Sequence, residues 1–275
     1  MINNKVADGK GHLVIKYEMD SKPRYGYGKP PHRKLYEILD NQRDVFKSYL
    51  GKFLSCYDLF EQIETETPQD DPRPGWHNIW ISGFDLISLC GLLKTNNPQN
   101  YIEVGSGNTT KFARETINYY GLKTRITSID PQPRAVIDQL CEQTMRSRLE
   151  DIGLELFKEL EPGDMIFMDG SHRTLMNSDA TVFFMEILPN LPSGVVVGIH
   201  DIFWPDDYPP QWIRRYYSEQ YLLAAYLLAE SNSFEVILAN NFIAQDEDLS
   251  TVLAPLWLQL PWITQHGAAF WMIKQ

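Results

Sequence analysis

The sequence predicts an α/β protein in which a mostly parallel β-sheet lies between layers of helices. From residue 100 onward, short apolar runs alternate with stretches of helical periodicity, a pattern typical of parallel strands joined by crossover helices. Runs such as YIEV and VVVGI are apolar at nearly every position, which indicates strands that are buried on both faces. Before residue 80 there is no such alternation, and we expect a helical N-terminal extension there.

The first 80 residues divide into an arm and a helical segment. Residues 1–32 are rich in Gly, Pro, Lys and Tyr without a sustained period, so we expect a loosely packed arm. Residues 33–63 place apolar side chains at helical spacing, and the proline-rich stretch 67–76 should be a loop. We therefore predict two parts. Residues 1–80 form an extension that covers the acceptor site or joins subunits of a homo-oligomer, and residues 81–275 form the main domain.

The main domain should begin with a short apolar helix, FDLISLCGLL (84–93). The predicted strands are YIEV (101–104), RITSID (125–130), DMIFMD (164–169), VVVGIHD (195–201), FEVILANNF (234–242) and AAFWMIKQ (268–275). Helices are expected from about Thr109 to Gly121, from residue 131 to about 143, over 174–191, and from the end of the loop IFWPDDYPPQW (202–212) to about residue 230.

Composition excludes several classes of protein. The net charge of −11 argues against a nucleic-acid partner, because such proteins usually carry a basic surface. The sequence has no run of about 18 apolar residues, so it predicts no membrane helix. The polar start MINNKVADGKGH lacks an apolar signal core. The three cysteines have no metal-type spacing. We expect a cytoplasmic protein with reduced thiols and no membrane partner.

The ends of the predicted strands carry the polar residues. Ligands of open parallel sheets bind beyond the carboxyl ends of the strands, where the strand order reverses. Four successive strands end in an acidic residue or a glycine turn: Glu103 to Gly107, Asp130, Asp169 to His172, and His200-Asp201. We therefore expect the functional site at this edge.

The turn YIEVGSGNTT distinguishes between two kinds of nucleotide ligand. Gly105 and Gly107 permit a tight turn, and the following helix aims free N–H groups at a ligand. The third glycine of a dinucleotide-binding GxGxxG turn is missing. Asp130 could hold both ribose hydroxyls, whereas Glu103 would repel a pyrophosphate and suit a cationic ligand. S-adenosylmethionine fits, because it has a ribose, a sulfonium and an ammonium group but no phosphate.

Four motifs, E-V-G-S-G, S-I-D, M-D-G-S-H and G-I-H-D, follow one another at four strand ends. With them, residues from about 84 to 275 resemble the class I S-adenosylmethionine-dependent methyltransferases, in particular the small-molecule O-methyltransferase branch that includes macrolide-sugar and catechol-type enzymes. The resemblance implies a seven-stranded Rossmann-like sheet whose last strand, AAFWMIKQ, is antiparallel and inserted beside FEVILANNF.

The resemblance also implies which residues contact the cofactor. The residues from Glu103 to Gly107 would hold the methionine part, Asp130 the ribose, and the pair Glu150-Asp151 the adenine. The full set of expected cofactor contacts is Glu103, Gly105, Ser106, Gly107, Asn108, Thr109, Asp130, Asp151 and Asp169.

Asp169 and His172 are the predicted catalytic residues. Methyl transfer to a hydroxyl needs the acceptor oxygen in line with the methyl group and a group that removes its proton. Histidine is suited to this role near neutral pH, and a D-x-x-H pair supplies metal ligand and base in the sugar methyltransferases that this chain resembles. Alternatively, His172 caps a helix that begins near Thr174.

A divalent cation such as Mg²⁺ would find oxygen ligands in Asp169 and Asp201. The family usually has a second carboxylate just before the Asp201 position, where this chain has His200. Histidine is a poor ligand for Mg²⁺, so either two carboxylates suffice, a softer metal binds, or none binds.

The loop 202–212 should lie over the acceptor site. We expect His200, Trp204 and Tyr208 to contact the acceptor, and Trp212 could extend the same apolar wall. The alternative is that this aromatic loop packs against its own domain.

The predicted function is S-adenosylmethionine-dependent O-methylation of a small hydroxylated metabolite, whose identity stays open among sugars, phenols, polyketides and peptide-derived molecules. A non-catalytic module that binds an adenosyl ligand would not need His172, Asp169 and Asp201. An NAD-dependent oxidoreductase is disfavoured by the missing third glycine and by Glu103.

Overall fold

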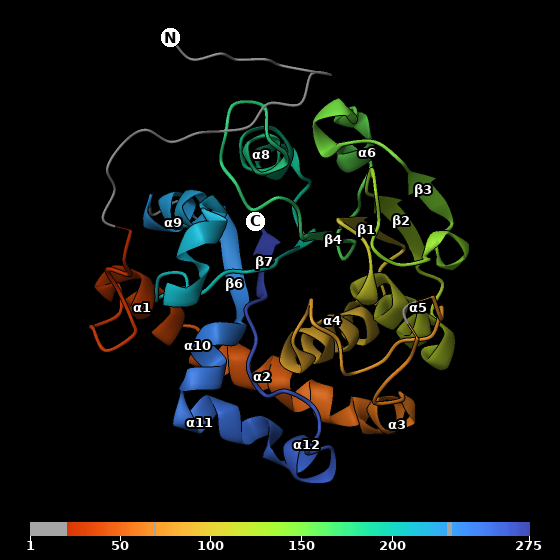
Figure 1. The fold of residues 1–275 in the computed structure, drawn as a ribbon, viewed down its shortest axis with the longest axis horizontal. Coiled ribbons are helices and arrows are strands. Elements are labelled where there is room, and N and C mark those ends of the chain that lie inside the picture. Colours follow the sequence, from red (N-terminus) through yellow and green to blue (C-terminus); the bar gives the residue numbers. More distant parts are fainter. Residues whose placement is uncertain (1–20, 69, 230–232) are drawn as a thin grey trace.

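The computed structural model describes residues 21–68, 70–229 and 233–275, which form a sheet covered by helices on both faces (Figure 1). The sheet has seven strands in the order β3-β2-β1-β4-β5-β7-β6. Neighbouring strands are parallel except at β7, which runs antiparallel to both β5 and β6. The predicted fold class is therefore confirmed, including an antiparallel last strand inserted beside the strand that precedes it in sequence.

The strands are β1 (Asn100–Val104), β2 (Arg125–Ile129), β3 (Gln143–Met145), β4 (Met165–Met168), β5 (Val196–Ile199), β6 (Phe234–Ala239) and β7 (Phe270–Lys274). The helices are α1 (Arg33–Asp40), α2 (Arg43–Phe53), α3 (Tyr57–Gln62), α4 (Gly83–Asn96), α5 (Asn108–Tyr120), α6 (Glu155–Lys158), α7 (Asp179–Val182), α8 (Leu188–Asn190), α9 (Glu219–Leu228), α10 (Asn240–Gln245), α11 (Glu247–Ser250) and α12 (Ala254–Gln259). Short 3₁₀ turns occur at 54–56, 138–140, 149–151, 210–215 and 251–253, and a π turn, Phe183–Ile187, joins α7 to α8. Within the described part of the chain, no helix is both long and apolar enough to cross a membrane.

The N-terminal helices share the core of the main domain. In Figure 1, α2 to α5 and α10 to α12 lie on one side of the sheet, and α6, α8 and α9 lie on the other. Helix α4 is buried from Gly83 to Leu93, as expected for a helix that is apolar all round. The Phe53 ring of α2 packs so closely on α4 that a Cβ at Gly91 would lie 2.1 Å from it. Helix α2 thus packs on the main domain, although the predicted boundary near residue 80 places α2 outside that domain.

The helix predicted from residue 131 to about 143 is wrong. After β2 the chain makes a turn, a 3₁₀ turn at 138–140 and the short edge strand β3, which pairs in parallel with β2. Pro131 and Pro133 lie at the start of this segment, and each lacks the N–H that a helix interior needs. This segment supplies the seventh strand, which no apolar run in the sequence had predicted.

Three further boundaries differ from the prediction. The helix expected from the end of the loop 202–212 begins only at Glu219. The helix expected over 174–191 begins only at Asp179, because Ser178 accepts a hydrogen bond from the Thr181 N–H as N-cap and Asn177 is in the left-handed region at φ 53°. The strand expected to reach residue 242 ends at Ala239, where α10 begins. There the Asn240 amide donates hydrogen bonds to Asp85 and Ser88 on α4.

Shared packing predicts that α2 contributes to the stability of the whole domain. Phe53 is completely buried, so Phe53→Ala should lower the free energy of unfolding by about 3–5 kcal/mol in a single urea transition. Lys47→Ala, at an exposed position of the same helix, should change it by less than about 0.5 kcal/mol. A separate early transition for the helical extension, with the main transition unchanged in Phe53→Ala, would contradict shared packing.

Candidate functional site

A cavity of about 1020 Å³ runs along the carboxyl ends of the parallel strands. The strand order reverses between β1 and β4, which are neighbours in the sheet while β2 and β5 lie on their outer sides. A crevice at such a reversal is where open α/β sheets bind ligands. The cavity is lined at one end by Gly105 to Thr109 and Asp130, and at the other by Asp169 to Arg173, His200 and Asp201.

The glycine turn after β1 brings its backbone against β4. Gly105 has φ 79°, and a Cβ there would lie 1.9 Å from the carbonyl oxygen of Asp169. Only glycine therefore fits this position. Gly107 has φ 174°, which any residue can adopt, and apart from its chain neighbours no atom of the described residues lies within 4 Å of a Cβ built there. Since Gly107 lines the cavity, a ligand has room to approach this backbone.

Glu103 supports the turn from behind and does not line the cavity. Its buried carboxylate accepts a hydrogen bond from the Tyr101 hydroxyl at 2.9 Å and another from the Thr110 hydroxyl. The Thr110 oxygen in turn accepts a hydrogen bond from the Gly107 N–H at 3.0 Å. The prediction that Glu103 contacts the cofactor directly therefore does not fit its position. Burial raises the pKa of Glu103 to about 7.

The second strand end orients Asp130 toward the cavity. The Ser106 N–H donates to one carboxylate oxygen at 2.9 Å and the Gln132 N–H to the other at 2.7 Å. Ser106, before α5, and Asn108 and Thr109, at its start, line the cavity with it, and all three are predicted cofactor contacts.

Of the pair Glu150-Asp151, expected to contact the adenine, the structure places only Glu150 in the cavity wall. Asp151 is exposed, and its carboxylate accepts a hydrogen bond from the Arg148 guanidinium at 3.0 Å. Asp151 does not line the cavity, whereas its neighbour Glu150 does. The 3₁₀ turn at 149–151 fixes which of the two carboxylates faces inward, and the sequence gave no signal of its register.

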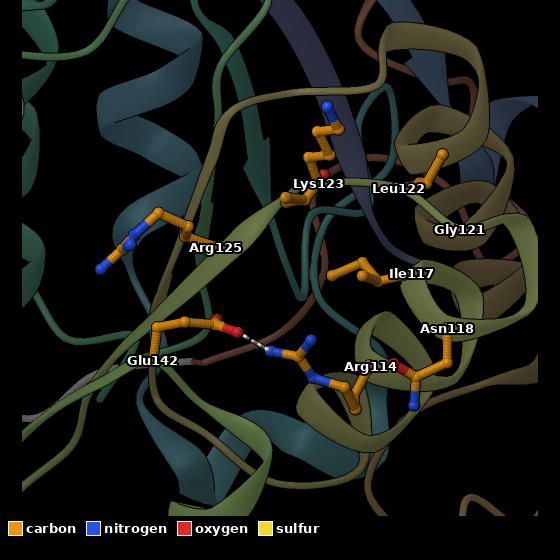
Figure 2. A pocket seen from close by; sticks show the side chains of 9 residues that line it. Arg114, Ile117, Asn118, Gly121, Leu122, Lys123, Arg125 and Glu142 are labelled. Carbon is orange, nitrogen blue, oxygen red and sulfur yellow. Dashed lines mark hydrogen bonds and ion pairs between the residues drawn. The ribbon is translucent and has the colours of Figure 1, made fainter.

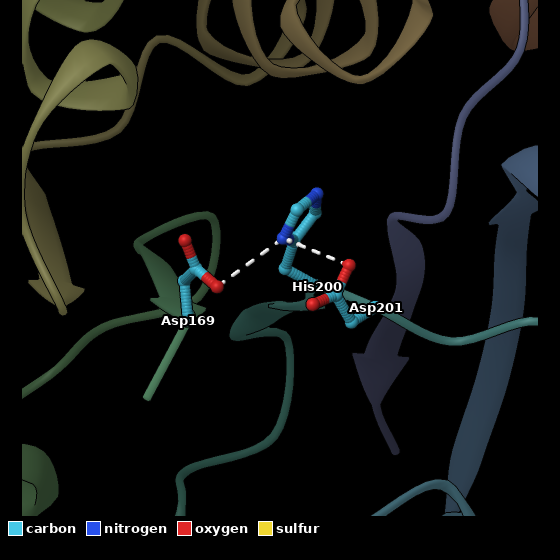
Figure 3. Close-up of side chains that lie close together, drawn as sticks. All are labelled: Asp169, His200 and Asp201. Carbon is cyan, nitrogen blue, oxygen red and sulfur yellow. Dashed lines mark hydrogen bonds and ion pairs between the residues drawn. The ribbon is translucent and has the colours of Figure 1, made fainter. Parts of the chain in front are cut away.

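Two histidines and four carboxylates form a buried cluster at the other end of the cavity. His172 has Nδ1 against Glu219, while its Nε2 lies 3.2 Å from Asp169 and 3.5 Å from Asp201. His200 has Nε2 3.3 Å from Asp85, while its Nδ1 lies 3.2 Å from Asp169 and 3.5 Å from Asp201. In Figure 3, Asp169 and Asp201 flank the His200 ring. The predicted residues Asp169, His172, His200 and Asp201 are thus brought together.

This arrangement favours the charged form of both imidazoles. Burial alone would lower the pKa of His172, but the charges of Glu219 and Asp201 and the hydrogen bond to Asp169 outweigh it, and the pKa lies well above the ordinary value. The pKa of His200 is likewise raised, because Asp201 and Asp169 outweigh burial. Burial opposes ionisation of Asp169, yet the two histidines hold the pKa of this carboxyl below its usual range.

The backbone is also unusual at the cluster. His172 and Asp201 both lie in the left-handed region, at φ 60° and 58°. Such a conformation costs free energy in residues other than glycine and persists where surrounding contacts enforce it. His172 begins the loop that precedes α7, so its predicted alternative as a cap of a helix starting at Thr174 does not fit.

Trp204 and Tyr208 are not in the cavity wall, contrary to the prediction. Both side chains are buried. The Trp204 indole donates to the carbonyl oxygen of Gln220, and the Tyr208 hydroxyl accepts from the Gln220 N–H. The loop therefore packs on its own domain, which is the alternative that the sequence left open. Only its last residue, Trp212, lines the cavity.

Several residues of the site were missed. Tyr217 and Arg215 line the cavity with Trp212. Residues of the N-terminal region also contribute to the wall, namely Thr67, Pro68, Gly75 and His77 to Ile81. Glu219 and Asp85 support the histidines from α9 and α4. The one signal available was Asp85, a carboxylate inside the apolar run FDLISLCGLL.

The cluster contains a donor set that fits a divalent cation. One ligand atom from each of Asp169, His200 and Asp201 lies within 4.8 Å of the other two. Two carboxylate oxygens and one imidazole nitrogen suit cations that accept nitrogen, such as Mn²⁺ or Zn²⁺, better than Mg²⁺. A cation would have to displace the proton on Nδ1 of His200.

A second hollow, of about 490 Å³, lies between α5 and the start of β2 (Figure 2). Its wall includes Arg114, which pairs with Glu142 at 2.8 Å, and the exposed side chains of Lys123 and Arg125. Because it lies at the amino end of β2, it is remote from the strand ends that carry the titratable cluster. We do not regard it as the active site.

Comparison with known proteins supports the interpretation of the motifs. A family model described as a methyltransferase domain matches residues 102–202, the span from β1 through β5 that contains all four motifs. The resemblance to class I S-adenosylmethionine-dependent methyltransferases is thereby confirmed. No curated protein is significantly similar in sequence.

Several solved structures of methyltransferases are similar to this chain, at low sequence identity. A plantazolicin methyltransferase in complex with a monoazolic desmethyl-plantazolicin analogue and S-adenosylhomocysteine (SAH) is 15% identical, with a TM-score of 0.46, over 88% of this chain and 98% of that chain. An O-methyltransferase from Bacillus cereus in complex with SAH is 15% identical, with a TM-score of 0.39, over 83% and 91%. A putative caffeoyl-CoA O-methyltransferase from Staphylococcus aureus is 13% identical, with a TM-score of 0.43, over 70% and 83%. The fold assignment depends on the strand order and not on these neighbours.

The raised pKa of Glu103 predicts a pH-dependent stability. The carboxyl has a pKa of about 7 in the fold against an ordinary value of 4.5. Its contribution is therefore fully present below about pH 4.5 and is lost as the pH rises through 7. Between pH 5 and 8 the wild type should lose about 2–3 kcal/mol more free energy of unfolding than Glu103→Gln, measured by urea titration. Equal losses in the two proteins would show that Glu103 is not held protonated.

Alanine should affect different properties at the two glycines: stability at Gly105 and SAH binding at Gly107. Gly105→Ala should lower stability by more than about 2 kcal/mol, because it combines a left-handed φ with a clash against Asp169. Gly107→Ala should change stability by less than about 0.5 kcal/mol but weaken SAH binding, because its Cβ enters space that the ligand needs. Thermal unfolding and calorimetric titration separate the two effects. Unchanged SAH affinity in Gly107→Ala would mean that the cofactor does not approach this turn.

Proposed function

We propose that this chain transfers the methyl group of S-adenosylmethionine to a hydroxyl group of a small acceptor molecule. The observation that carries the proposal is a single cavity with two chemically different ends. One end has a glycine turn, a helix start and a ribose-type carboxylate, and the other has a histidine–carboxylate cluster. The methyltransferase match over residues 102–202 supports methyl transfer as the reaction that links them.

The cofactor end suits an adenosyl group. Backbone N–H groups of Ser106 and Gln132 fix the Asp130 carboxylate, and its remaining lone pairs can accept hydrogen bonds from both ribose hydroxyls. Glu150 lies at the place where we expect the adenine contact. Asp169 lies between the two ends of the cavity. Its carbonyl oxygen touches Gly105, and its carboxylate faces the two histidines. The sulfonium methyl and the acceptor hydroxyl would therefore meet beside Asp169, where fixed orientation lowers the barrier.

The proton of the acceptor hydroxyl needs a receiving group. We assign this role to His172, oriented by Glu219 and facing Asp169 through Nε2. Because its pKa is raised, the imidazole carries a proton at neutral pH and must lose it before it can act as a base. The proposal therefore requires that the reaction be faster in alkaline solution.

A divalent cation would be held by Asp169, His200 and Asp201. Bound there, it would lower the pKa of the acceptor hydroxyl and orient its oxygen.

Cofactor recognition predicts a specific effect at Asp130. Asp130→Asn removes the acceptor of one ribose hydroxyl and should weaken SAH binding about tenfold or more, measured by titration calorimetry. Asp151→Asn removes an equal charge outside the cavity and should bind SAH like the wild type. If Asp151→Asn weakened binding and Asp130→Asn did not, the assigned adenosyl site would be wrong.

The base predicts the pH profile of the reaction. With an acceptor found by screening, kcat/KM should rise as the pH increases above 7, because only neutral His172 accepts the proton. Glu219→Gln removes the neighbouring negative charge, lowers the pKa of His172 and should move the rising limb toward lower pH. His172→Asn should abolish the limb. A limb that stays in place in both variants would exclude His172 as the base.

A further inference from the structure

The acceptor end of the cavity has a wall of two arginines and two aromatic rings. The wall consists of Arg173, Trp212, Arg215 and Tyr217, and all four line the same cavity as Asp169 and His172. It differs in character from the acidic cluster beside it.

The aromatic rings hold the two guanidinium groups beside the reaction centre. Tyr217 packs on the His172 ring with centroids 4.4 Å apart. The guanidinium of Arg173 lies 5.2 Å from the Tyr217 ring centre, and that of Arg215 lies 5.6 Å from the same ring and 3.7 Å from the Trp212 ring. Both cations are thus gathered around one tyrosine that touches the proposed base.

Within the described part of the chain, neither guanidinium has a carboxylate partner. Arg173 donates only to backbone carbonyl oxygens, those of Arg215 at 3.0 Å and Ser171 at 2.9 Å. By contrast, Arg148, at the cofactor end of the same cavity, pairs with Asp151 and Glu150. Two adjacent, exposed guanidinium groups without a carboxylate partner among the described residues, in a chain of net charge −11, offer a binding place for an anionic group.

We propose that the methyl acceptor is a planar molecule with an anionic group, carboxylate or phosphate, which Arg173 and Arg215 bind while its hydroxyl faces Asp169. Trp212 and Tyr217 provide the flat contacts for its ring. This inference rests on the proposed function, since it identifies the class of substrate for the same site. Binding of the charge by these two arginines also fixes which end of the molecule reaches the methyl group.

The test compares matched probes in the presence of SAH. The probes are 4-hydroxybenzoate, 4-hydroxyphenyl phosphate and the uncharged 4-hydroxybenzamide, and affinities are measured by ligand-observed NMR with the full chain. We expect at least one anionic probe to bind about tenfold or more tightly than the amide. The stronger of the two identifies carboxylate or phosphate as the recognised group. Raising the salt concentration should reduce the preference.

Variants assign the preference to the wall. Arg173→Gln and Arg215→Gln should each remove most of the anion preference and leave SAH binding unchanged. Arg214→Gln, at an exposed neighbour that does not line the cavity, should retain it. Binding of both anionic probes no tighter than the amide, no binding of either anion while SAH binds, or the same loss in Arg214→Gln would overturn the inference. Failure of SAH itself to bind would instead contradict the proposed function.

Discussion

The site depends on a buried chain of alternating charges, from Asp85 through His200, Asp169 and His172 to Glu219. Each member comes from a different part of the fold: α4, the ends of β5 and β4, the loop after β4, and the start of α9. A buried charge is tolerated only when its partners are in place. Removing one member would leave the others unsatisfied, so the cluster fixes how these elements meet and holds two residues in left-handed conformations. The resulting geometry holds the Asp169 carboxylate in a fixed position at the cavity.

Asp169 also connects the two ends of the cavity. Its carbonyl oxygen touches Gly105, and the turn at Gly105 is braced by Glu103 through Thr110. A shift in either support would move the cofactor relative to the acceptor. Methyl transfer requires the three reacting centres in line, and the close packing of the glycine turn on the end of β4 is a direct means of fixing that line.

The fold and the position of the site could be predicted because both follow from local pattern. Apolar runs mark buried strands, and polar residues at their carboxyl ends mark the crevice. The side-chain direction within each motif could not be predicted. Glu103 faces Tyr101 rather than the cavity. Glu150 lines the cavity, whereas Asp151 does not. Trp204 is buried in the domain, whereas Trp212 lines the cavity. Glu219 was missed because a carboxylate 47 residues from His172 gives no sequence signal of their contact.

The most direct test of the central claim is calorimetric titration of the unmodified chain with SAH and with NADH. The account predicts that SAH binds at one site per chain and that NADH does not bind, because the glycine turn lacks the third glycine of a pyrophosphate site. Binding of NADH without binding of SAH would contradict it, and the histidine–carboxylate cluster would then have to belong to a redox enzyme.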